Sequence, residues 1–414
     1  MELIVLAGGR GERLKPITDT RPKPLIPILG RPLLERTLDL FIDKISRVVV
    51  VAEYRYDDIK RFIDEYTRDR GVEIEIVRQG KELGTGHAVQ VALSHTRSDE
   101  VVVVYGDLYL EKSLVEKIIS APRDSLVGLS VPNPWDYGVL LVEGDRVLRV
   151  LEKPQTLEIP SDIINAGVYK FSSKTLELVN EIGFSERGEI ELTDLVKIAR
   201  ERGIDIRLVR SSVEEWSEIG RPWDLLEIHK KLLQRLNERI IKGKTDPRVV
   251  IEGPVYIGEG AIVKGSTYIE GPVYIDDEAV IGPNSYIRPY TYVGRRARIG
   301  FSTEVKESVI LEEARLPHLN YAGDSVICEK VNLGAGTLIA NLRFDEQPVK
   351  VTLRNTRVSS GRVKLGAFIG GHVKTGINVS ILPGVKIGAY SIIYPGVVVG
   401  KDVEYGSVIR SSTV

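Results

Sequence analysis

The chain has 414 residues, a length that predicts two or three domains, and 43% of them are hydrophobic, which is ample for buried cores. Its 57 Lys and Arg residues nearly balance its 58 Asp and Glu residues, so a general affinity for nucleic acid is disfavoured. The single cysteine, Cys328, excludes a disulfide framework, and no apolar run has the length of a membrane span or the pattern of a signal peptide. These features predict a cytoplasmic protein with neither a nucleic-acid nor a membrane partner.

The first 210 residues or so alternate between apolar strands and helical stretches. The strands include "LIVLAG", "RVVVVA", "EVVVVYGD" and "IDIRLVR", and the helical stretches include "PLLERTLDLFIDK" and "GHAVQVALSHT". This alternation predicts an α/β fold with a mostly parallel sheet, helices on both faces and ligands beyond the carboxyl ends of the strands. One segment, "YGVLLVEGDRVLRVLEKP", breaks the pattern and predicts an antiparallel hairpin around "EGD", so the sheet is mixed.

An amphipathic stretch, "PWDLLEIHKKLLQRLNERII", begins at Pro222. The residues on its apolar face at helical spacing are Leu225, Leu226, His229, Leu232, Leu233 and Leu236. This spacing favours a helix packed between two domains. We therefore divide the chain into an N-terminal domain over 1–225, a linker helix over 222–245 and a C-terminal domain over 246–414.

After Pro247 aliphatic residues recur at every sixth position. They are Ile251, Ile257, Val263, Ile269, Ile275, Ile281, Ile287, Val293, Ile299, Val305 and Leu311. Neither a helix nor an ordinary strand has this period, whereas a coil whose flat faces each use six residues does. The pattern predicts a parallel β-helix of hexapeptide repeats in which each aliphatic side chain stacks on those of neighbouring coils.

The repeat changes phase twice. It returns at Ile327, Leu333 and Ile339, and then at Val363, Ile369, Ile381, Ile387, Ile393 and Val399, with Thr375 as the one exception. We expect the two breaks, 312–326 and 340–362, to be loops that leave the coil. Loops on a rigid scaffold are where binding and catalytic residues concentrate.

A glycine-rich and basic stretch, "LAGGRGERLKPITDTRPKPLIPI", follows the first strand and runs from Leu6 to Ile28. Its glycines allow backbone N–H groups to approach an anion closely, and Arg13 and Lys23 are long enough to reach phosphate oxygens. The spacing matches neither the P-loop nor the dinucleotide-binding fingerprint. By itself the stretch fits a phosphate site or a plain surface loop equally well.

The full stretch, read as L-A-G-G-x-G-x-R-L, P-I-T and P-K-P-L-I-P-I, closely resembles the signature of sugar-1-phosphate nucleotidylyltransferases. Further segments resemble the landmarks of that family in order: "QGKELGTGHA" (79–88), "YGD" (105–107), "DYGVL" (136–140), "EKP" (152–154), "NAGVY" (165–169) and "WSEIGRP" (216–222). The resemblance covers roughly the first 225 residues. It implies transfer of a nucleotidyl group from a nucleoside triphosphate to a sugar 1-phosphate, with release of pyrophosphate.

The resemblance also implies roles for the matched residues. Arg13 would stabilise the developing pyrophosphate charge, Lys23 would hold the α-phosphate, and Asp107 with Glu218 would bind Mg²⁺. Glu218 stands where the family usually has Asp, and Asp107, taken alone, could instead cap the next helix. The nucleotide-binding residues would be Leu6, Gly8, Gly9, Gly11, Gln79, Gly84, Thr85 and Gly106, and those for the sugar phosphate Gly138, Glu152, Lys153 and Asn165. Gln79 suits a pyrimidine base, which leaves both UTP and dTTP as candidate substrates.

Four segments of the repeat region resemble a second family. They are "IRPYTYVG" (287–294), "EVKESV" (304–309), "RLPHLNYAGDS" (315–325) and "VNLGAGTLIANLRF" (331–344). Their order resembles the acetyltransferase half of the bifunctional bacterial and archaeal enzymes that form UDP-N-acetylglucosamine. The resemblance implies that the β-helix is left-handed, that the protein is a homotrimer and that acetyl-CoA is a co-substrate.

In this second resemblance His318 matches the general base that takes a proton from the amine of glucosamine 1-phosphate. A lone loop histidine is more often solvated, but the surrounding "PHLNYAGD" favours the base. The residues matched to the sugar phosphate are Arg288, Lys306, Tyr321 and Asn332, and those matched to acetyl-CoA are Ala335, Asn341 and Lys350. Whether galactosamine 1-phosphate also serves is left open. Gln347 stands where the family usually has Lys and Leu342 where an aromatic is common, so we hypothesise that Lys350 supplies the missing cation.

Three functions fit these patterns to different degrees. The favoured one is a bifunctional enzyme that acetylates a hexosamine 1-phosphate and then transfers a nucleotidyl group to it. The alternative is a single-activity sugar-1-phosphate nucleotidylyltransferase whose β-helix is structural or regulatory, but such relatives lack "PHLNYAGD". A non-catalytic scaffold like the nucleotide-exchange subunits of translation is disfavoured, because Gly8, Lys23 and Asp107 are all present.

Overall fold

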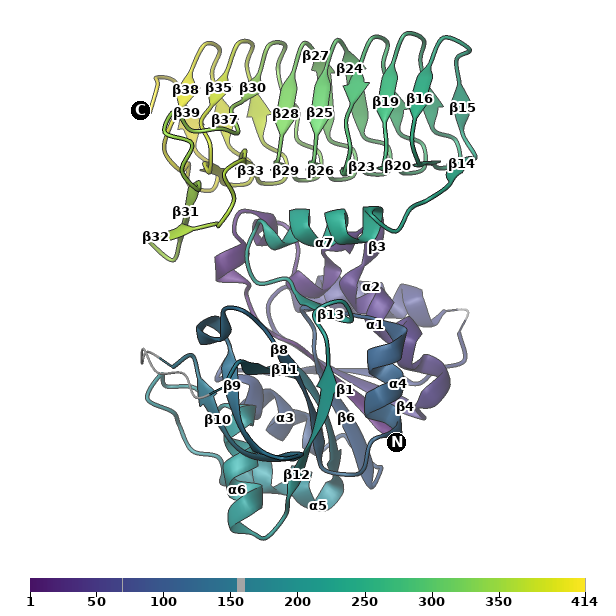
Figure 1. Cartoon of the computed structure of the whole chain (residues 1–414). Helices are drawn as coiled ribbons and strands as arrows, with labels where there is room; N and C mark the ends of the chain where they lie inside the picture. Colours follow the sequence, from purple (N-terminus) through teal and green to yellow (C-terminus); the bar gives the residue numbers. More distant parts are fainter. Residues whose placement is uncertain (69, 155–160, 414) are drawn as a thin grey trace. The chain divides into compact units, whose positions relative to one another are not determined.

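The structure is a computed structural model that describes residues 1–68, 70–154 and 161–413 (Figure 1). The described residues form two compact units. The first unit contains Met1–Arg10, Pro22–Ile26 and Pro32–Ile219, and the second contains Gly11–Arg21, Pro27–Arg31 and the chain from Gly220 onward. Two short segments of the first 31 residues therefore belong to the second unit.

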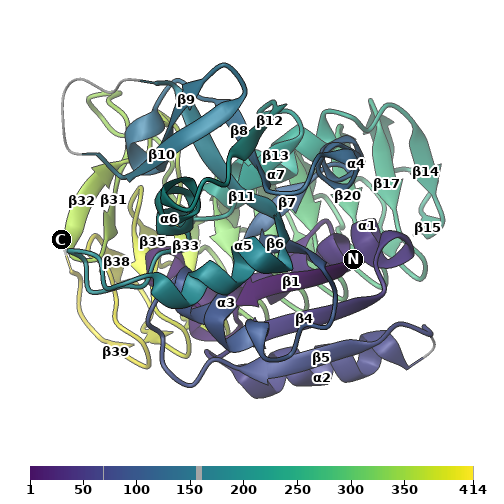
Figure 2. The same cartoon turned by 90° about the horizontal axis from the view of Figure 1, so that it is seen from below.

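The first unit is built on a mixed sheet with the strand order β5-β4-β1-β6-β11-β8-β12-β10-β9. The strands are β1 (Glu2–Ala7), β4 (Arg47–Ala52), β5 (Ile74–Arg78), β6 (Glu100–Tyr105), β8 (Ser125–Ser130), β9 (Gly138–Glu143), β10 (Arg146–Glu152), β11 (Ile163–Ser172) and β12 (Ile206–Ser211). Strands β5, β4, β1 and β6 are parallel to one another and lie side by side in Figure 2. The predicted hairpin is present as the antiparallel pair β9 and β10.

Helices cover both faces of this sheet. They are α1 (Leu33–Phe41), α2 (Tyr56–Thr67), α3 (Thr85–Leu93), α4 (Lys112–Ser120), α5 (Ser173–Glu177) and α6 (Leu195–Glu201). Alternate residues of β1 point to opposite faces: Ile4 packs in one core with residues of α3 and α6, whereas Leu3 and Val5 pack in another with residues of α1, α2 and α4. Burial on both faces explains why the central strands are almost continuously aliphatic.

Short elements complete the first unit and its borders. They are β2 (Pro27–Ile28), β3 (Arg31–Pro32), β7 (Leu108–Leu110), β13 (Trp216–Glu218) and the 3-10 helices η1 (Glu12–Leu14), η2 (Ile17–Asp19), η3 (Lys23–Leu25), η4 (Ile42–Lys44), η5 (Pro134–Asp136), η6 (Leu178–Glu181) and η7 (Leu192–Asp194). Of these, η1, η2 and β2 belong to the second unit. Strands β7 and β13 pair antiparallel outside the main sheet.

The second unit is a left-handed parallel β-helix with three sheet faces (Figure 1). One face contains β14 (Arg239–Ile241), β17 (Val255–Ile257), β20 (Val273–Ile275), β23 (Thr291–Val293), β26 (Val309–Ile310), β29 (Val326–Ile327), β33 (Phe368–Ile369) and β36 (Lys386–Ile387). The second contains β16 (Val250–Glu252), β19 (Tyr268–Glu270), β22 (Tyr286–Ile287), β25 (Glu304–Lys306), β28 (Tyr321–Gly323), β30 (Leu338–Ile339), β35 (Ser380–Ile381) and β38 (Val398–Val399). The third contains β15 (Lys244–Thr245), β18 (Ile262–Val263), β21 (Val280–Ile281), β24 (Arg298–Phe301) and β27 (Arg315–His318), and then β34 (Lys374–Thr375), β37 (Ile392–Ile393) and β39 (Val408–Ile409).

The six-residue period arises because each face contributes one inward aliphatic residue per coil. On the first face, Ile257 pairs with Ile275 and Ile275 with Val293, and these side chains form one continuous buried core. Thr375 is the polar exception in its column. Its hydroxyl accepts a hydrogen bond from Gly334 N (2.9 Å) and lies 2.8 Å from Thr337 Oγ1, so it is satisfied inside the core.

The structure corrects the prediction for the first phase break. Residues 312–326 do not leave the coil, because β27 and β28 within them pair in register with the strands of the preceding coil. The change of phase is a coil shortened by one residue: Val293 pairs with Ile310 rather than with Leu311. The deletion moves later inward positions by one residue without interrupting the stack, as the pairing of Ile310 with Ile327 shows.

The second phase break does leave the coil, as predicted. It forms a hairpin of β31 (Lys350–Leu353) and β32 (Thr356–Ser359), and the stack resumes where Ile369 pairs with Ile327. Val363, which the period had included, is exposed. Helix α7 (Asp224–Leu233) ends earlier than the pattern predicted, since Arg239–Ile241 already form a strand of the first coil. Among the described residues, every helix is too short or too polar to cross a membrane.

Candidate active sites

The carboxyl ends of the central parallel strands of the first unit meet at one edge of the sheet. In register, β1 ends at Ala7 and β4 at Ala52, and Leu6 of β1 lies beside Tyr105 at the end of β6. Gly106 N donates to Leu6 O (2.9 Å), and a Cβ on Gly106 would lie 2.7 Å from that oxygen. Glycine is therefore required where β6 passes β1.

Several of the predicted nucleotide-binding residues lie at or near this edge. The buried Gln79 donates from its backbone N–H to Ala52 O (2.9 Å) and from Nε2 to Gly84 O (3.1 Å). A Cβ on Gly8 would lie 2.3 Å from Gln79 Oε1, so a larger residue there would displace the glutamine. Gly9 borders open space. The structure thus brings Gly8, Gln79 and Gly84 together.

The start of helix α3 is fixed by backbone contacts. Gly84 has φ +107°, and a Cβ there would lie 2.5 Å from Ile190 O, so both conformation and space demand glycine. Thr85 Oγ1 accepts a hydrogen bond from Leu192 N (3.0 Å). These contacts hold the N-terminus of α3 in place. Gly11 and Arg13 lie in the second unit, where Gly11 adopts φ +66° immediately before η1.

Two predicted catalytic residues, Lys23 and Asp107, form an ion pair of 2.5 Å. The side chain of Lys23 is 14% exposed and that of Asp107 is 21% exposed, so water screens this pair only partly. Asp107 does not cap the next helix, because α4 begins at Lys112 with Glu111 in the N-cap position. The alternative that Asp107 caps the next helix is therefore wrong.

The second predicted metal ligand lies on a neighbouring strand. Asp107 O accepts a hydrogen bond from Ile219 N (2.9 Å), and Glu218 of β13 pairs with Leu108 of β7. Within 1–68, 70–154 and 161–413, no group of three or more His, Cys, Asp or Glu side chains could hold a metal ion. The backbones of Asp107 and Glu218 lie close together, and carboxylates are the residue type through which proteins commonly bind Mg²⁺ together with the phosphates of a substrate.

The predicted sugar residues Gly138 and Glu152 face each other across the β9–β10 hairpin. They pair in register, and a Cβ on Gly138 would lie 2.9 Å from Glu152 Oε1. Burial raises the pKa of Glu152, and the nearby charge of Glu191 adds to this, although Arg187 at 3.6 Å opposes it. The carboxylate is thus held in a poorly hydrated place, ready to accept hydrogen bonds from a ligand.

Asn165 is oriented by the buried Tyr169, whose hydroxyl lies beside that of the partly buried Tyr105. Its Nδ2 donates to Tyr169 Oη (2.6 Å), its Oδ1 accepts from Gly167 N (3.2 Å), and the hydroxyls of Tyr169 and Tyr105 lie 3.0 Å apart. Both tyrosines lie in motifs noted above, "YGD" and "NAGVY", but were given no role, and nothing in the spacing of Arg187 marks it. The exposed Lys153 has φ +44° and donates from its backbone to Tyr137 O (3.0 Å).

In the second unit the predicted sugar-phosphate residues lie on consecutive coils of one face. Arg288 follows β22, Lys306 ends β25 and Tyr321 begins β28, and these strands are neighbours in the sheet. Arg288 Nη1 donates to Glu304 Oε1 (2.9 Å). Burial raises the pKa of Tyr321, so its hydroxyl stays protonated and can donate to an anion.

A residue without an assigned role, Asp324, joins these groups. Its side chain is 1% exposed, and its carboxylate accepts from Lys306 Nζ (3.1 Å to each oxygen) and from Asn341 Nδ2 (2.6 Å). Asn341 Nδ2 also lies 3.3 Å from Tyr321 Oη. A Cβ on Gly323 would lie 2.6 Å from both of these atoms, which explains the glycine of the motif.

Arg362 extends this cluster toward helix α7. Its Nη2 lies 3.3 Å from Asp324 Oδ1 and 2.7 Å from Glu307 Oε1, while its Nη1 binds Glu227 of α7. Lys230 of the same helix lies 3.1 Å from Glu307. Sequence reasoning missed this arginine because only the excursion of 340–362 brings it back to the coil.

The predicted base, His318, ends β27 and is exposed at a coil corner. Its backbone N–H donates to Asn320 Oδ1 (3.1 Å), and its carbonyl accepts from Gly336 N (3.2 Å). The backbone of Asn332 joins adjacent coils by bridging Arg315 and Lys374, and Ala335 O accepts from Asn378 N (2.8 Å). The corner thus presents the imidazole outward on a rigid backbone.

The predicted cation Lys350 is exposed at the start of β31, where it pairs with Ser359. Gln347 is held by its neighbour Asp345, whose Oδ1 accepts from Gln347 N (3.2 Å). Within the second unit these contacts do not direct either side chain toward His318 or Asp324. That Lys350 supplies the charge of the lysine that is usual at position 347 stays a prediction.

Three families match this chain. Residues 2–235 match the Nucleotidyl transferase family, 269–376 the GMPPB C-terminal domain, and 366–401 the bacterial transferase hexapeptide (six repeats). A bifunctional sugar-1-phosphate nucleotidylyltransferase/acetyltransferase from Sulfurisphaera tokodaii is 47% identical over 99% of this chain and 100% of that protein.

The chain belongs to this bifunctional family. Two further members are proteins named bifunctional protein GlmU. The one from Methanocaldococcus jannaschii is 41% identical over 98% of this chain and 96% of its own length, and the one from Methanococcus maripaludis is 44% identical over 99% and 97%. Membership confirms the predicted enzyme class and the order of a nucleotidyltransferase followed by a hexapeptide-repeat half.

Proposed function

We propose that the chain catalyses two successive reactions of UDP-N-acetyl-hexosamine synthesis. The second unit transfers an acetyl group from acetyl-CoA to the amine of glucosamine 1-phosphate, and the first then joins the product to a uridylyl or thymidylyl group from UTP or dTTP. The observation that carries the proposal is that one chain contains both the Lys23–Asp107 pair and the cluster of Lys306, Asp324 and Asn341. Each fits one of the two reactions.

Nucleotidyl transfer brings two anions together, so its catalysis consists mainly of charge neutralisation and alignment. In our proposal Lys23 neutralises the α-phosphate that the sugar phosphate attacks, and Arg13 neutralises the departing pyrophosphate. Gln79 and the glycine edge hold the base and phosphates, while Glu152 and Asn165 accept and donate hydrogen bonds to the sugar. Lys153 meets the incoming sugar phosphate.

Mg²⁺ is part of this proposal. Asp107 and Glu218 would hold it, and it would supply positive charge to the triphosphate oxygens when bound. The adjacent backbones of β7 and β13 support this assignment. Glutamate is one methylene longer than aspartate, which suits ligation from further out or through water.

Acetyl transfer needs a base and an anion-binding surface. His318 accepts the proton that the amine loses as its nitrogen bonds the thioester carbon; the C–S bond then breaks, and the departing thiolate of coenzyme A takes up that proton and leaves as the thiol. Arg288, Lys306 and Tyr321 grip the sugar phosphate, and Asn332 and Asn341 contact the amino sugar and acetyl group. The exposed corner of His318 beside this face supports the assignment.

One observation favours a second candidate, a single-activity nucleotidylyltransferase with a regulatory β-helix. Residues 269–376 match the GMPPB C-terminal domain, and they include His318 and Asp324. The full-length similarity to bifunctional relatives favours the first candidate. Thiol release from acetyl-CoA in the presence of glucosamine 1-phosphate separates the two.

We further propose a cytoplasmic homotrimer. Exposed aliphatic side chains on the outer faces of the β-helix support association with further copies; they include Ile262, Leu338, Ile377, Ile392 and Val408. Light scattering at micromolar concentration tests the proposal, and a monomer contradicts it.

The test of the two reactions uses one substitution in each unit. Asp107→Ala is expected to abolish pyrophosphate release while acetylation persists, and His318→Ala to do the reverse. A panel of sugar 1-phosphates with UTP or dTTP, with and without acetyl-CoA, identifies the substrates. Acetylation by purified His318→Ala at the wild-type rate contradicts the assigned base.

A further inference from the structure

The segment Gly11–Arg21, which we call the signature segment, belongs to the second unit although it carries part of the nucleotidyltransferase motif. It contains Arg13 and ends two residues before Lys23. Its last side chain, Arg21, is 14% exposed, and Nη2 lies 2.6 Å from Glu312 Oε1 and 2.7 Å from Glu329 Oε2. The β-helix therefore holds the end of the motif by a largely buried double ion pair.

The two glutamates occupy adjacent coil corners. Lys330 N donates to Glu312 O (3.1 Å), which places Glu329 and Glu312 on neighbouring rungs. Like charges so placed repel, and burial makes the repulsion larger because water does not screen it. Arg21 offsets the charge of both. Burial alone would lower the pKa of Arg21, but the two carboxylates outweigh burial and raise that pKa.

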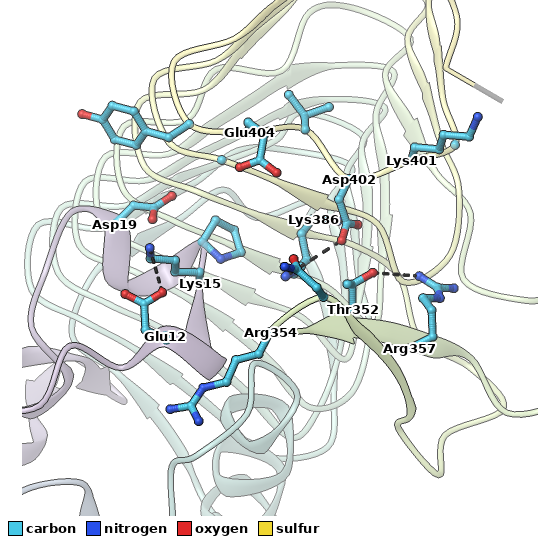
Figure 3. Close-up of a pocket in the computed structure, with 16 residues that line it drawn as sticks. Glu12, Lys15, Asp19, Thr352, Arg354, Arg357, Lys386, Lys401, Asp402 and Glu404 are labelled. Carbon is cyan, nitrogen blue, oxygen red and sulfur yellow. Dashed lines mark hydrogen bonds and ion pairs between the residues drawn. The ribbon is translucent and has the colours of Figure 1, made fainter. Parts of the chain in front are cut away.

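Other residues of the signature segment also contact the coils. Asp19 Oδ2 accepts from Ala389 N (3.1 Å), and a Cβ on Gly370 would lie 3.0 Å from Pro16 Cβ. Beyond them lies a cavity of about 600 Å³. Figure 3 shows Glu12 and Lys15 along one wall and Lys386 and Asp402 along another, with the β31–β32 hairpin below. The cavity separates this part of the segment from the hairpin, and Arg21 is the residue of the segment that forms ion pairs with two glutamates of the coils.

We propose that Arg21, clamped by Glu312 and Glu329, is a positioning residue for nucleotidyl transfer. The clamp fixes the C-terminal end of the signature segment. Arg21 lies between Arg13 and Lys23 in the chain, so the clamp also restrains the backbone that carries these two predicted phosphate-binding residues. A displacement of about 1 Å in such groups lowers a rate by as much as about a hundredfold. The inference rests on the proposed nucleotidyl transfer.

The experiment compares Arg21→Met, Arg21→Lys and the triple variant Arg21→Met/Glu312→Gln/Glu329→Gln with wild type. Arg248→Met is the matched control, because Arg248 forms an exposed ion pair with Asp246 on the same β-helix. Three quantities are measured on full-length protein: pyrophosphate release from UTP and N-acetylglucosamine 1-phosphate, thiol release from acetyl-CoA, and the melting temperature.

We expect Arg21→Met to lower kcat for pyrophosphate release about tenfold to a hundredfold, with KM for UTP and the acetylation rate nearly unchanged. Arg21→Lys restores a cation between the two carboxylates and should recover much of the rate. The triple variant removes the repulsion and should recover the melting temperature while pyrophosphate release stays slow. A purely structural role predicts the opposite, namely that rate and melting temperature recover together.

A wild-type kcat in Arg21→Met, or a recovered kcat in the triple variant, overturns the positioning role of Arg21 but leaves the proposed nucleotidyl transfer standing. If Arg21→Met does not fold, Glu312→Gln replaces it, since it keeps the Glu329 pair, and an unchanged kcat there overturns the clamp as well. Wild-type protein that releases no pyrophosphate overturns the proposed nucleotidyl transfer, and the role of the clamp with it.

Discussion

Asp324→Ala tests the proposed acetyl site directly. This buried carboxylate orients two side chains that are predicted to bind substrate, Lys306 and Asn341, and has no predicted contact with a substrate itself. It accepts from Lys306 Nζ, Asn341 Nδ2 and Arg362 Nη2. Removing one partner of a buried ion pair costs about 3–5 kcal/mol of folding free energy. The lower end applies here, since Lys306 is 18% exposed and Arg362 keeps Glu307 at 2.7 Å. We therefore expect a loss of about 3 kcal/mol.

The same change should slow acetylation. A hydrogen bond to a charged group contributes about 1.5–3 kcal/mol, which at about 1.4 kcal/mol per factor of ten corresponds to roughly tenfold to a hundredfold in kcat/KM for glucosamine 1-phosphate. Asp324→Asn keeps the shape and one acceptor oxygen, so it should fall between Asp324→Ala and wild type in both stability and rate.

Thiol release from acetyl-CoA reports the rate, and chemical denaturation reports the stability. Pyrophosphate release is the internal control, because Asp324 belongs to the second unit and Lys23 and Asp107 belong to the first. Acetylation by Asp324→Ala at the wild-type rate, with the free energy of unfolding unchanged, would refute the reasoning.

Three further predictions concern metal, pH and the acetyl donor. EDTA should abolish pyrophosphate release and spare acetylation, since only the first needs Mg²⁺ at Asp107; equal loss of both contradicts this split. Because burial raises the pKa of Glu152, its ionised form costs folding free energy near neutral pH and the cost disappears below its unfolded pKa. Glu152→Gln should therefore have a higher melting temperature than wild type at neutral pH but not at about pH 4. Its KM for the sugar 1-phosphate should rise. Equal melting temperatures of the two proteins at neutral pH would contradict the prediction. Lys350→Ala should slow acetylation about tenfold and Gln347→Lys should change it little; the reverse pattern would mean that Lys350 has not replaced the missing lysine.

Local sequence predicted the regular parts of both units. Aliphatic runs predict the central strands, because strands that are buried on both faces need aliphatic side chains throughout. The turn between β9 and β10 predicts their hairpin. The β-helix is read from its period, because one inward residue per face is a requirement of the coil itself. Family resemblance supplied the candidate residues, and the structure places Lys23 beside Asp107 and Asn341 beside Tyr321.

The six-residue period alone did not predict the structure correctly where the coil is irregular. A one-residue deletion and an excursion both shift the phase, so residues 312–326 were expected to form a loop although they remain in the coil. The pairing of strands distinguishes the two cases, and pairing is a long-range property that no local pattern contains.

By itself the sequence determined the two architectures and the family and proposed candidate residues for both sites, because these depend on periodicity and on short motifs. Only the tertiary structure decided which groups hold those side chains. Asp324 gathers Lys306 and Asn341 across neighbouring coils, and Arg21 reaches two glutamates roughly three hundred residues away in the chain. Such partners are set by which coils stack and where a segment returns to them. Since burial makes each unpaired charge costly, the fold has to bring its partner from wherever the chain places it.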